Sequence, residues 1–252
     1  MRLAHKIILL TGACGGIGRA AARRFVDEGA TLVLVDIDPS ALAEAAAALG
    51  PAASHVAGDV ADPGQMERAV RFAVERHGGI DVFVANAGIE GAVERIEDYP
   101  LEDFERVYRV NVGGVFLGLK YAMPVLRERG GGSVIITSSA AGVSGIAKLS
   151  AYVASKHAVI GLMRSAALEG ARYNIRVNTV NPGPVETRMM RSIEEGNAPG
   201  EADSIKRKMS AAVPLRRYAL PEEVAGLMAF LASDDSSYCT GGVYLVDGGG
   251  NA

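Results

Sequence analysis

Two hydrophobic patterns alternate along the whole chain. Short apolar runs rich in β-branched residues are typical of buried strands, and the stretches between them repeat apolar residues at helical spacing. We expect strands at 6–10, 31–35, 54–57, 80–85, 133–137, 175–180 and 242–246, and helices at 19–29, 41–49, 62–77, 101–129, 151–173 and 221–231. This alternation predicts an α/β fold, a doubly wound Rossmann-type three-layer sandwich whose seven-stranded parallel sheet carries helices on both faces.

Two stretches depart from the regular pattern. Asn111 lies in the middle of the long helix 101–129, where a buried polar side chain needs either a functional partner or a local backbone bond with a kink. Residues 185–212 lose their periodicity, and we expect an irregular substrate lid there, within a single domain spanning 1–252. Ser150 is the expected N-cap of the helix 151–173.

Composition narrows the function classes. The chain has 252 residues, 49% hydrophobic and 22% charged, with 26 Lys and Arg against 29 Asp and Glu. The formal net charge of −3 predicts neither a nucleic-acid nor a membrane partner. Two cysteines and four scattered histidines predict neither a disulfide framework nor a metal site. Without a signal-peptide pattern, or an apolar run near the ~18 residues of a membrane span, a cytoplasmic protein is expected.

A glycine-rich loop follows the first strand. Residues 11–18 read TGACGGIG, so Gly12, Gly16 and Gly18 form a G-x-x-x-G-x-G pattern between a strand and a helix. Glycines let the backbone approach a pyrophosphate closely, and the helix N-terminus offers free N–H groups to it. The motif therefore predicts a dinucleotide site.

Asp36 ends the second strand, 18 positions after Gly18. An acidic residue there accepts the adenosine ribose hydroxyls in dinucleotide folds, and it repels a 2′-phosphate. Gly15 and Ile37 supply no cation to bind such a phosphate, so NAD is the expected cofactor. The alternative role for Asp36, capping the following helix, can equally fall to Asp38 or Ser40.

Tyr152 and Lys156 are four residues apart on a predicted helix, so their side chains share one face. An ammonium group near a phenol favours the phenolate, and we expect Lys156 to lower the pKa of Tyr152 toward the working range of a general base. Ser139 lies thirteen residues earlier, at the end of a strand, where α/β folds bind ligands. The alternatives are an ordinary helix surface for the pair and a turn for Ser138 and Ser139.

Taken in order, these motifs resemble the short-chain dehydrogenase/reductase family in its single-domain form, over essentially the whole chain. Asp59 and Val60 resemble the pair that holds the adenine. Residues 85–88, ANAG, resemble the family's NNAG, with Ala85 in place of the first Asn. The resemblance implies a catalytic tetrad of Asn111, Ser139, Tyr152 and Lys156. It implies that the cofactor is held by Gly12, Gly15, Gly16, Ile17, Gly18, Asp36, Ile37, Asp59, Val60, Asn86, Ala87, Gly88, Tyr152, Lys156, Pro182, Gly183, Val185 and Thr187.

The resemblance also implies the roles. Tyr152 is the general acid/base of hydride transfer between a secondary alcohol and its ketone, and Ser139 binds the substrate oxygen. Lys156 lowers the Tyr152 pKa and holds the nicotinamide ribose. The region of Asn111 binds a water that links Lys156 to solvent. A homotetramer is implied, because family members pair their long helices across a two-fold axis.

The substrate pocket is expected to be apolar, and therefore to suit a largely uncharged, cyclic or aryl-substituted alcohol or ketone. Arg188 and Arg191 are the counter-evidence, since either could clamp a carboxylate if Glu194 and Glu195 did not hold it at the surface. The residues expected around the substrate are Ser139, Ala141, Val143, Ile146, Tyr152, Met189 and Met190.

Three other functions use the same fold: a non-catalytic NAD-binding scaffold, an enoyl reductase, and an NADPH-dependent 3-oxoacyl carrier-protein reductase. The complete tetrad argues against the scaffold. The regular spacing of Ser139 and Tyr152 argues against the enoyl reductase. Asp36, together with the lack of an arginine at position 15, argues against the NADPH enzyme.

Overall fold

The computed structural model describes residues 1–252 and contains one parallel sheet. Its seven strands stand in the order β3-β2-β1-β4-β5-β6-β7, and each pairs in parallel with its neighbours. The expected seven-stranded parallel sheet is confirmed, with strand ends displaced by at most two residues. The strands are β1 Ile7–Thr11, β2 Thr31–Asp36, β3 Ala53–Ala57, β4 Val82–Ala85, β5 Gly132–Thr137, β6 Ile175–Pro182 and β7 Val243–Val246.

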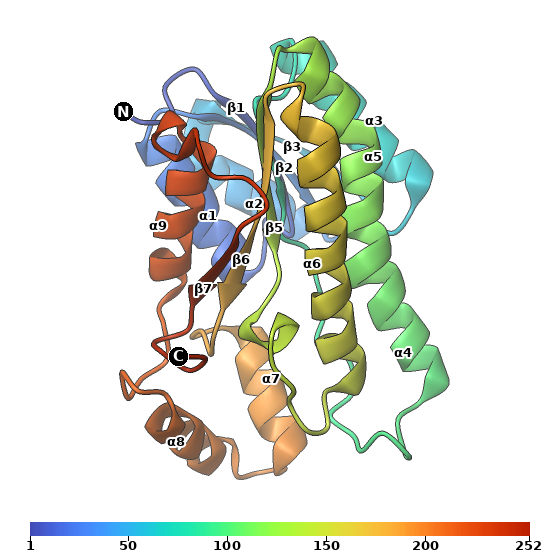
Figure 1. Ribbon diagram of the computed structural model, residues 1–252, viewed down its shortest axis with the longest axis vertical. Coiled ribbons are helices and arrows are strands. Elements are labelled where there is room, and N and C mark those ends of the chain that lie inside the picture. The colour runs from blue at the N-terminus through green and yellow to red at the C-terminus, as the bar shows by residue number, and fades with distance from the viewer.

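Helices cover both faces of this sheet (Figure 1). One face carries α1, α2 and α9, and the other carries α3, α5 and α6. Strand order reverses between β1 and β4, and a doubly wound sheet opens a crevice for ligands at such a point. The helices are α1 Gly16–Asp27, α2 Pro39–Leu49, α3 Pro63–His77, α4 Leu101–Tyr108, α5 Gly114–Glu128, α6 Ser150–Ala171, α7 Arg188–Asn197, α8 Ala202–Ala212 and α9 Pro221–Ala232.

The structure corrects two sequence expectations. Residues 185–212 are not irregular, because they form α7 and α8 at the lower end of the molecule (Figure 1). Both helices are short and carry charges of both signs, which hid the apolar positions that α7 buries at Ile193. Ser150 is the first residue of α6 rather than its cap, and Leu149 takes the capping position without a side-chain bond.

The long helix 101–129 is interrupted as its central asparagine suggested. Between α4 and α5, residues Arg109–Gly113 form a π-helical turn around Asn111. Such single turns insert one extra residue and recur at functional sites. The kink is therefore a built feature of this segment, and Asn111 is the buried residue within it.

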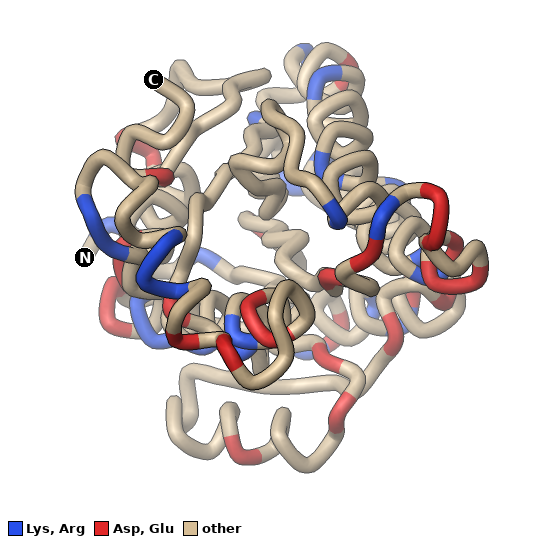
Figure 2. The backbone as a smooth tube through the Cα atoms, turned by 90° about the horizontal axis from the view of Figure 1, so that it is seen from below, with Lys and Arg blue, Asp and Glu red and all other residues tan.

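Charges of both signs are mixed over the surface. Seen from the end that carries α7 and α8, lysine and arginine positions are interspersed with aspartate and glutamate (Figure 2). None of the helices has the length and apolar character needed to cross a bilayer. His, Cys, Asp and Glu side chains nowhere gather in a group of three that would hold a metal ion.

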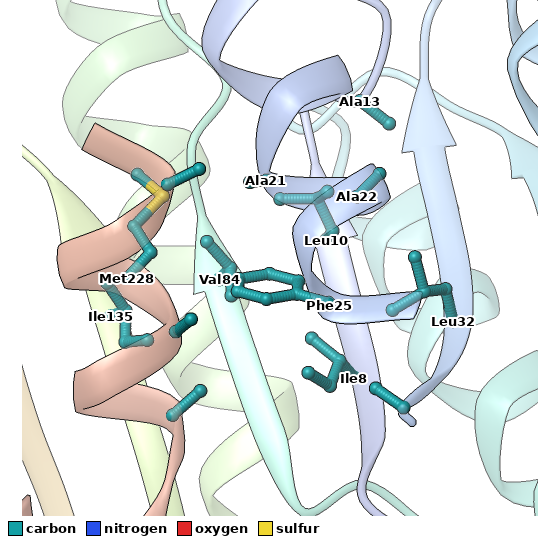
Figure 3. Packing of buried hydrophobic residues seen from close by; sticks show 14 of the residues in the cluster. Ile8, Leu10, Ala13, Ala21, Ala22, Phe25, Leu32, Val84, Ile135 and Met228 are labelled. Carbon is teal, nitrogen blue, oxygen red and sulfur yellow. The ribbon is translucent and has the colours of Figure 1, made fainter. Parts of the chain in front are cut away.

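The core lies in two apolar layers, one on each face of the sheet. Phe25 of α1 is fully buried against Ile8 and Leu10 of β1, and Met228 of α9 closes the same layer (Figure 3). Burying one such side chain contributes about 1.5–3 kcal/mol. Because both faces are covered, the strands are held rigidly, and their carboxyl ends become a stable platform for the loops that follow.

Candidate active site

A cavity of about 1120 Å³ lies at the carboxyl edge of the sheet. Its walls come from the segments that follow β1, β2, β4, β5 and β6, and from the lid helices α7 and α8. In open α/β sheets this edge is where ligands bind. The chain thus places its glycine loop, its acidic strand end and its Ser, Tyr and Lys residues around one space.

The glycine loop is packed too tightly for side chains. Gly12 has φ +64°, and a Cβ there would stand 2.7 Å from the Ala87 Cα. A Cβ on Gly18 would meet the Gly12 carbonyl oxygen at 2.1 Å. Helix α1 begins at Gly16 with no side-chain cap, so its first amides keep free donors beside the cavity. Uncapped amides at a positive helix end suit a pyrophosphate.

Asn86 and Thr11 join the ends of three strands. The Thr11 hydroxyl accepts hydrogen bonds from the backbone N–H of Asn86 at 3.0 Å and of Ala87 at 3.2 Å. The Asn86 side chain donates to the Gly12 carbonyl at 3.1 Å and accepts from the Thr137 hydroxyl at 3.1 Å. These bonds set the distance between the glycine loop and the end of β5, and they explain why the N-A-G triplet is no ordinary turn.

Asp36 is oriented by backbone donors. Its carboxylate accepts from Cys14 N–H and Ile37 N–H, each at 2.8 Å. The remaining lone pairs are free for hydroxyl donors. Burial, followed by the Asp36 charge, raises the pKa of the Cys14 thiol to about 11, so the thiol stays neutral. Asp38 rather than Asp36 caps α2, through Ser40 N–H and Ala41 N–H.

These features fit a dinucleotide along one side of the cavity. The loop leaves no room for Cβ atoms, the helix end offers free amides, and the oriented carboxylate lies at the end of β2. All of the residues expected to hold the cofactor line the cavity: Gly12, Gly15, Gly16, Ile17, Gly18, Asp36, Ile37, Asp59, Val60, Asn86, Ala87, Gly88, Tyr152, Lys156, Pro182, Gly183, Val185 and Thr187.

Helix α6 presents Tyr152 and Lys156 to the other side of the cavity. The Lys156 ammonium is buried, donates to the Thr137 carbonyl at 2.9 Å, and lies 5.4 Å from the centre of the Tyr152 ring. The Ser139 hydroxyl accepts from Ala141 N–H at 3.1 Å and donates to the Pro182 carbonyl at 3.4 Å. The three side chains therefore line the cavity together, held by backbone partners.

The expected lowering of the Tyr152 pKa is wrong in its net direction. Burial raises the pKa of Tyr152, a hydrogen bond with Ser139 opposes that shift, and the charge of Glu90 adds to it. Burial also lowers the pKa of Lys156 to about 8. Both groups are driven toward their neutral forms because the surrounding protein disfavours either charge.

Asn111 does not line the cavity, although it lies beside it. Its side chain exchanges two hydrogen bonds with the backbone of Ile89, both at 2.9 Å, and donates to the Ser155 hydroxyl at 3.0 Å. A Cβ on Gly88 would meet both Asn111 Oδ1 at 3.2 Å and Lys156 Nζ at 3.3 Å. The local backbone bond and the polar role are thus compatible, since Asn111 fastens the loop that faces Lys156.

Six of the seven residues that the sequence places around the substrate lie in the cavity lining. Ser139, Ala141, Ile146, Tyr152, Met189 and Met190 line the cavity, whereas Val143 does not and is 44% exposed. The 3-10 turn Ala140–Gly142 redirects the chain before Val143. Sequence reasoning missed the lid residues Ile193, Asn197, Ile205, Lys208 and Met209, whose i, i+3, i+4 spacing within 205–209 was the available signal.

Arg188 and Arg191, both on α7, differ in whether they face the cavity and whether they pair with a carboxylate. Arg191 lies outside the cavity lining and pairs with Asp203 at 2.6 Å and Glu194 at 3.3 Å. Arg188 lines the cavity and makes no ion pair. Arg109 and Lys208, which the sequence had not singled out, also line the cavity and are also without an ion pair. The side chains of these three cations are largely exposed, so water screens their charge at the cavity rim.

A family model described as enoyl-(acyl carrier protein) reductase matches residues 12–251. The chain belongs to the short-chain dehydrogenase/reductase family. That family assignment covers the glycine loop, the Ser, Tyr and Lys positions and the lid in one alignment. The family resemblance noted in the sequence is therefore confirmed.

Relatives within the family are dehydrogenases and reductases by name. The chain is 38% identical to levodione reductase of Leifsonia aquatica, over 100% of this chain and 96% of the relative. It is 39% identical to cyclohexanol dehydrogenase of Acinetobacter sp. (strain SE19), over 97% and 94%. A solved structure of NAD⁺-bound xylitol dehydrogenase superposes with TM-score 0.95 at 36% identity, over 98% of this chain and 100% of that one.

The buried lysine of this family member predicts an unusual pH dependence of stability. The folded pKa of Lys156 is about 8, against 10.5 for the free side chain, so between these values the unfolded chain binds the extra proton. Unfolding free energy should therefore rise with pH across this window, by at most about 1.4 kcal/mol per pH unit. The measurement is urea unfolding at pH 7.5, 8.5 and 9.5 for the wild type and for Lys156→Met.

The variant lacks the titrating group, so the wild type should gain stability relative to it as pH rises. The raised pKa of Tyr152 acts in the opposite direction near and above its usual titration range, and both proteins are therefore compared again in a Tyr152→Phe background. Parallel pH curves for the two proteins would contradict the depressed lysine pKa.

Proposed function

We propose that this protein is an NAD-dependent oxidoreductase that moves hydride between a secondary alcohol and the corresponding ketone. The observation that carries the proposal is the meeting of Ser139, Tyr152 and Lys156 in the cavity whose other side fits a dinucleotide. The names of its relatives support the same reaction class, since cyclohexanol is a secondary alcohol. Levodione reductase and xylitol dehydrogenase are likewise redox enzymes by name.

Bound NAD would supply the group that accepts or returns the hydride. The glycine loop and the first amides of α1 would hold its pyrophosphate, Asp36 its adenosine ribose, and Asp59 and Val60 its adenine. Lys156 would hold the nicotinamide ribose with the Tyr152 ring packed beside it, and the stretch Pro182–Thr187 would close over the nicotinamide ring. Every one of these residues lines the cavity.

The proton chemistry belongs to Tyr152. Its hydroxyl takes the alcohol proton during oxidation and returns it to the ketone oxygen during reduction. Ser139 would donate its one hydroxyl proton to that oxygen in place of the long 3.4 Å bond to the Pro182 carbonyl. Burial raises the pKa of Tyr152, and the presence of Ser139 beside it acts to lower that pKa. Because burial opposes a phenolate charge, the ammonium of Lys156 is the compensating group on the same helix face. Asn111, through the Ile89 loop, sets the wall where a relay water would reach Lys156.

The wider setting follows from the same features. Free, half-buried Cys14 and Cys239 support a reducing, cytoplasmic setting. A homotetramer is supported by the groove between α5 and α6, where Phe116 is 53% and Leu168 82% exposed, since such apolar surface favours self-association. The lid formed by residues 185–212 is proposed to close the substrate end of a single domain spanning 1–252.

NAD(H) should be preferred over NADP(H) by about tenfold or more in kcat/KM, because the Asp36 carboxylate would face the 2′-phosphate. The nearby cation Arg19 is already engaged with the Cys14 carbonyl at 3.0 Å. Asp36→Ala should narrow the preference. Asp62→Ser is the matched control, because it removes a carboxylate that caps α3 outside the cavity lining and a serine can keep that cap. Equal use of both cofactors by the wild type would sink the NAD assignment.

Tyr152→Phe should lower turnover about 10²- to 10⁴-fold, the range that general acid/base catalysis contributes. The ring keeps its packing and loses only the transferable proton, so NADH affinity from fluorescence titration should stay within about twofold. The control is Tyr238→Phe, at a fully exposed tyrosine remote from the cavity lining. Turnover by Tyr152→Phe comparable to wild type would exclude Tyr152 as the acid/base.

The substrate should be a largely uncharged secondary alcohol or ketone, cyclic or aryl-substituted, because apolar side chains such as Ile146, Met190 and Met209 dominate the lining around Tyr152. NADH formation is measured with cyclohexanols that match in size and differ by one carboxylate. The neutral member should have the higher kcat/KM. A tenfold preference for the carboxylate that disappears in Arg188→Ala, and persists in the control Arg191→Ala, would overturn this proposal.

The family model's description points to enoyl reduction as the second candidate. The same purified protein is therefore assayed with NADH and a 2-enoyl thioester. Reduction of the carbon–carbon double bond without any alcohol oxidation across the panel would replace the alcohol dehydrogenase proposal. Ser139 and Tyr152 both line the cavity, and two hydroxyl groups there suit a carbonyl oxygen, which favours alcohol and ketone chemistry.

A further inference from the structure

One buried side-chain atom in the whole chain lacks a hydrogen-bond partner, the Oδ1 of Asn181. Asn181 lies near the end of β6 and is 0% exposed. Leaving a buried amide oxygen unpaired costs the full desolvation of that group, so native proteins rarely keep one without a compensating role. An apolar residue of similar size would avoid this cost, and the retained asparagine therefore needs an explanation.

The other half of the amide touches the catalytic loop. Asn181 Nδ2 donates to the backbone carbonyl of Ser139 at 2.9 Å. The next residue, Pro182, accepts from the Ser139 hydroxyl at 3.4 Å through its own carbonyl. Ser139 is thus bound to the end of β6 at both its carbonyl and its hydroxyl. The same carbonyl accepts from Gly142 N–H at 2.8 Å, and Ser138 N–H donates to the Val180 carbonyl at 2.9 Å, so Asn181 adds the one side-chain donor to a loop that backbone bonds also hold.

Geometry explains why Asn181 can reach this loop. Alternate residues of a strand share one face, and Ile175 and Val177 belong to the core layer under α6. Asn181 follows them on that face, beneath the turn that leads from Ser139 into α6. No other side chain donates to the Ser139 carbonyl.

Asn178 supplies the contrast within the same strand. It is equally buried, but its Nδ2 donates to the Cys239 carbonyl at 2.7 Å and its Oδ1 accepts from Gly242 N–H at 3.0 Å. Both halves of this amide are satisfied, and they join β6 to the segment before β7. Asn178 therefore has the bonding of a structural residue, whereas Asn181 is half satisfied and bound only to the loop of Ser139.

We propose that Asn181 is a positioning residue for the reaction: its amide N–H holds the Ser139 backbone so that the serine hydroxyl faces Tyr152. The unpaired oxygen is the cost of placing one donor under that loop. This inference rests on the proposed role of Ser139, and it adds a residue that lies outside the cavity lining.

The test begins with Asn181→Ala in the full-length protein. Turnover should fall about tenfold, because small displacements of a positioned group cost rate steeply. KM for the alcohol and the NADH dissociation constant should stay within about twofold. The melting temperature should change little, because the lost hydrogen bond and the removed orphan oxygen act in opposite directions. Asn181→Ser, which removes less volume, is measured beside it.

A double-mutant cycle separates positioning from general damage. If Asn181 acts through Ser139, then adding Asn181→Ala to Ser139→Ala should reduce the residual turnover no further. Additive losses would overturn the inference, as would failure of both Asn181 variants to fold. Asn178→Ala is the matched control, and it should lower the melting temperature. Any fold-loss of turnover that it causes alone should also appear when it is added to Ser139→Ala.

The cycle also separates this inference from the proposed function. Full turnover by Ser139→Ala would remove the proposed role of Ser139, and the positioning role would fall with it. A strong loss in Ser139→Ala, with none in either Asn181 variant, would overturn the positioning role alone.

Discussion

The hydrogen bonds of Asn86 and Thr11 connect the loops that form the cavity. They join the loops after β1 and β4 and reach the end of β5. The glycine loop and the loop of Ser139 are therefore held at a defined distance from one another. Parallel strands alone would bring these loops to the same edge, but without a fixed spacing. The tight approach of Gly12 to Ala87 is possible only because no side chain stands between them. A polar node of this kind is worth its burial when every member is satisfied.

Burial shifts the pKa values of the two titratable groups on the cavity wall formed by α6. Tyr152 and Lys156 are both pushed toward neutrality, in opposite directions on the pH scale, because burial disfavours either charge. Because the neutral forms of both groups are favoured, a proton can be transferred at this site with little change in the number of charged groups. The lysine is held on the Thr137 carbonyl, at the end of β5, so the sheet itself orients the face of α6 that carries Tyr152 and Lys156.

Helices α7 and α8, which we propose as a substrate lid, form the wall of the cavity that lies outside the sheet. Helices α7 and α8 contribute Met190, Ile193, Ile205 and Met209 to the cavity, and the bond from Arg191 to Asp203 joins the two helices. Methionine side chains adapt their shape readily, so this wall of the cavity is more adaptable than the edge of the sheet opposite it.

Local patterns in the chain were enough to predict the alternating elements, the parallel sheet, the glycine loop and the positions of Ser139, Tyr152 and Lys156. These follow from local periodicity and from short motifs, which neighbouring residues largely dictate. Features that depend on distant parts of the chain became visible when the chain was folded. Burial reversed the expected pKa shift of Tyr152, Val143 turned away from the cavity, and residues 185–212 formed helices whose mixed charges had hidden them. The half-satisfied amide of Asn181 is of the same kind, because its bond to Ser139 spans 42 residues and no local pattern records it.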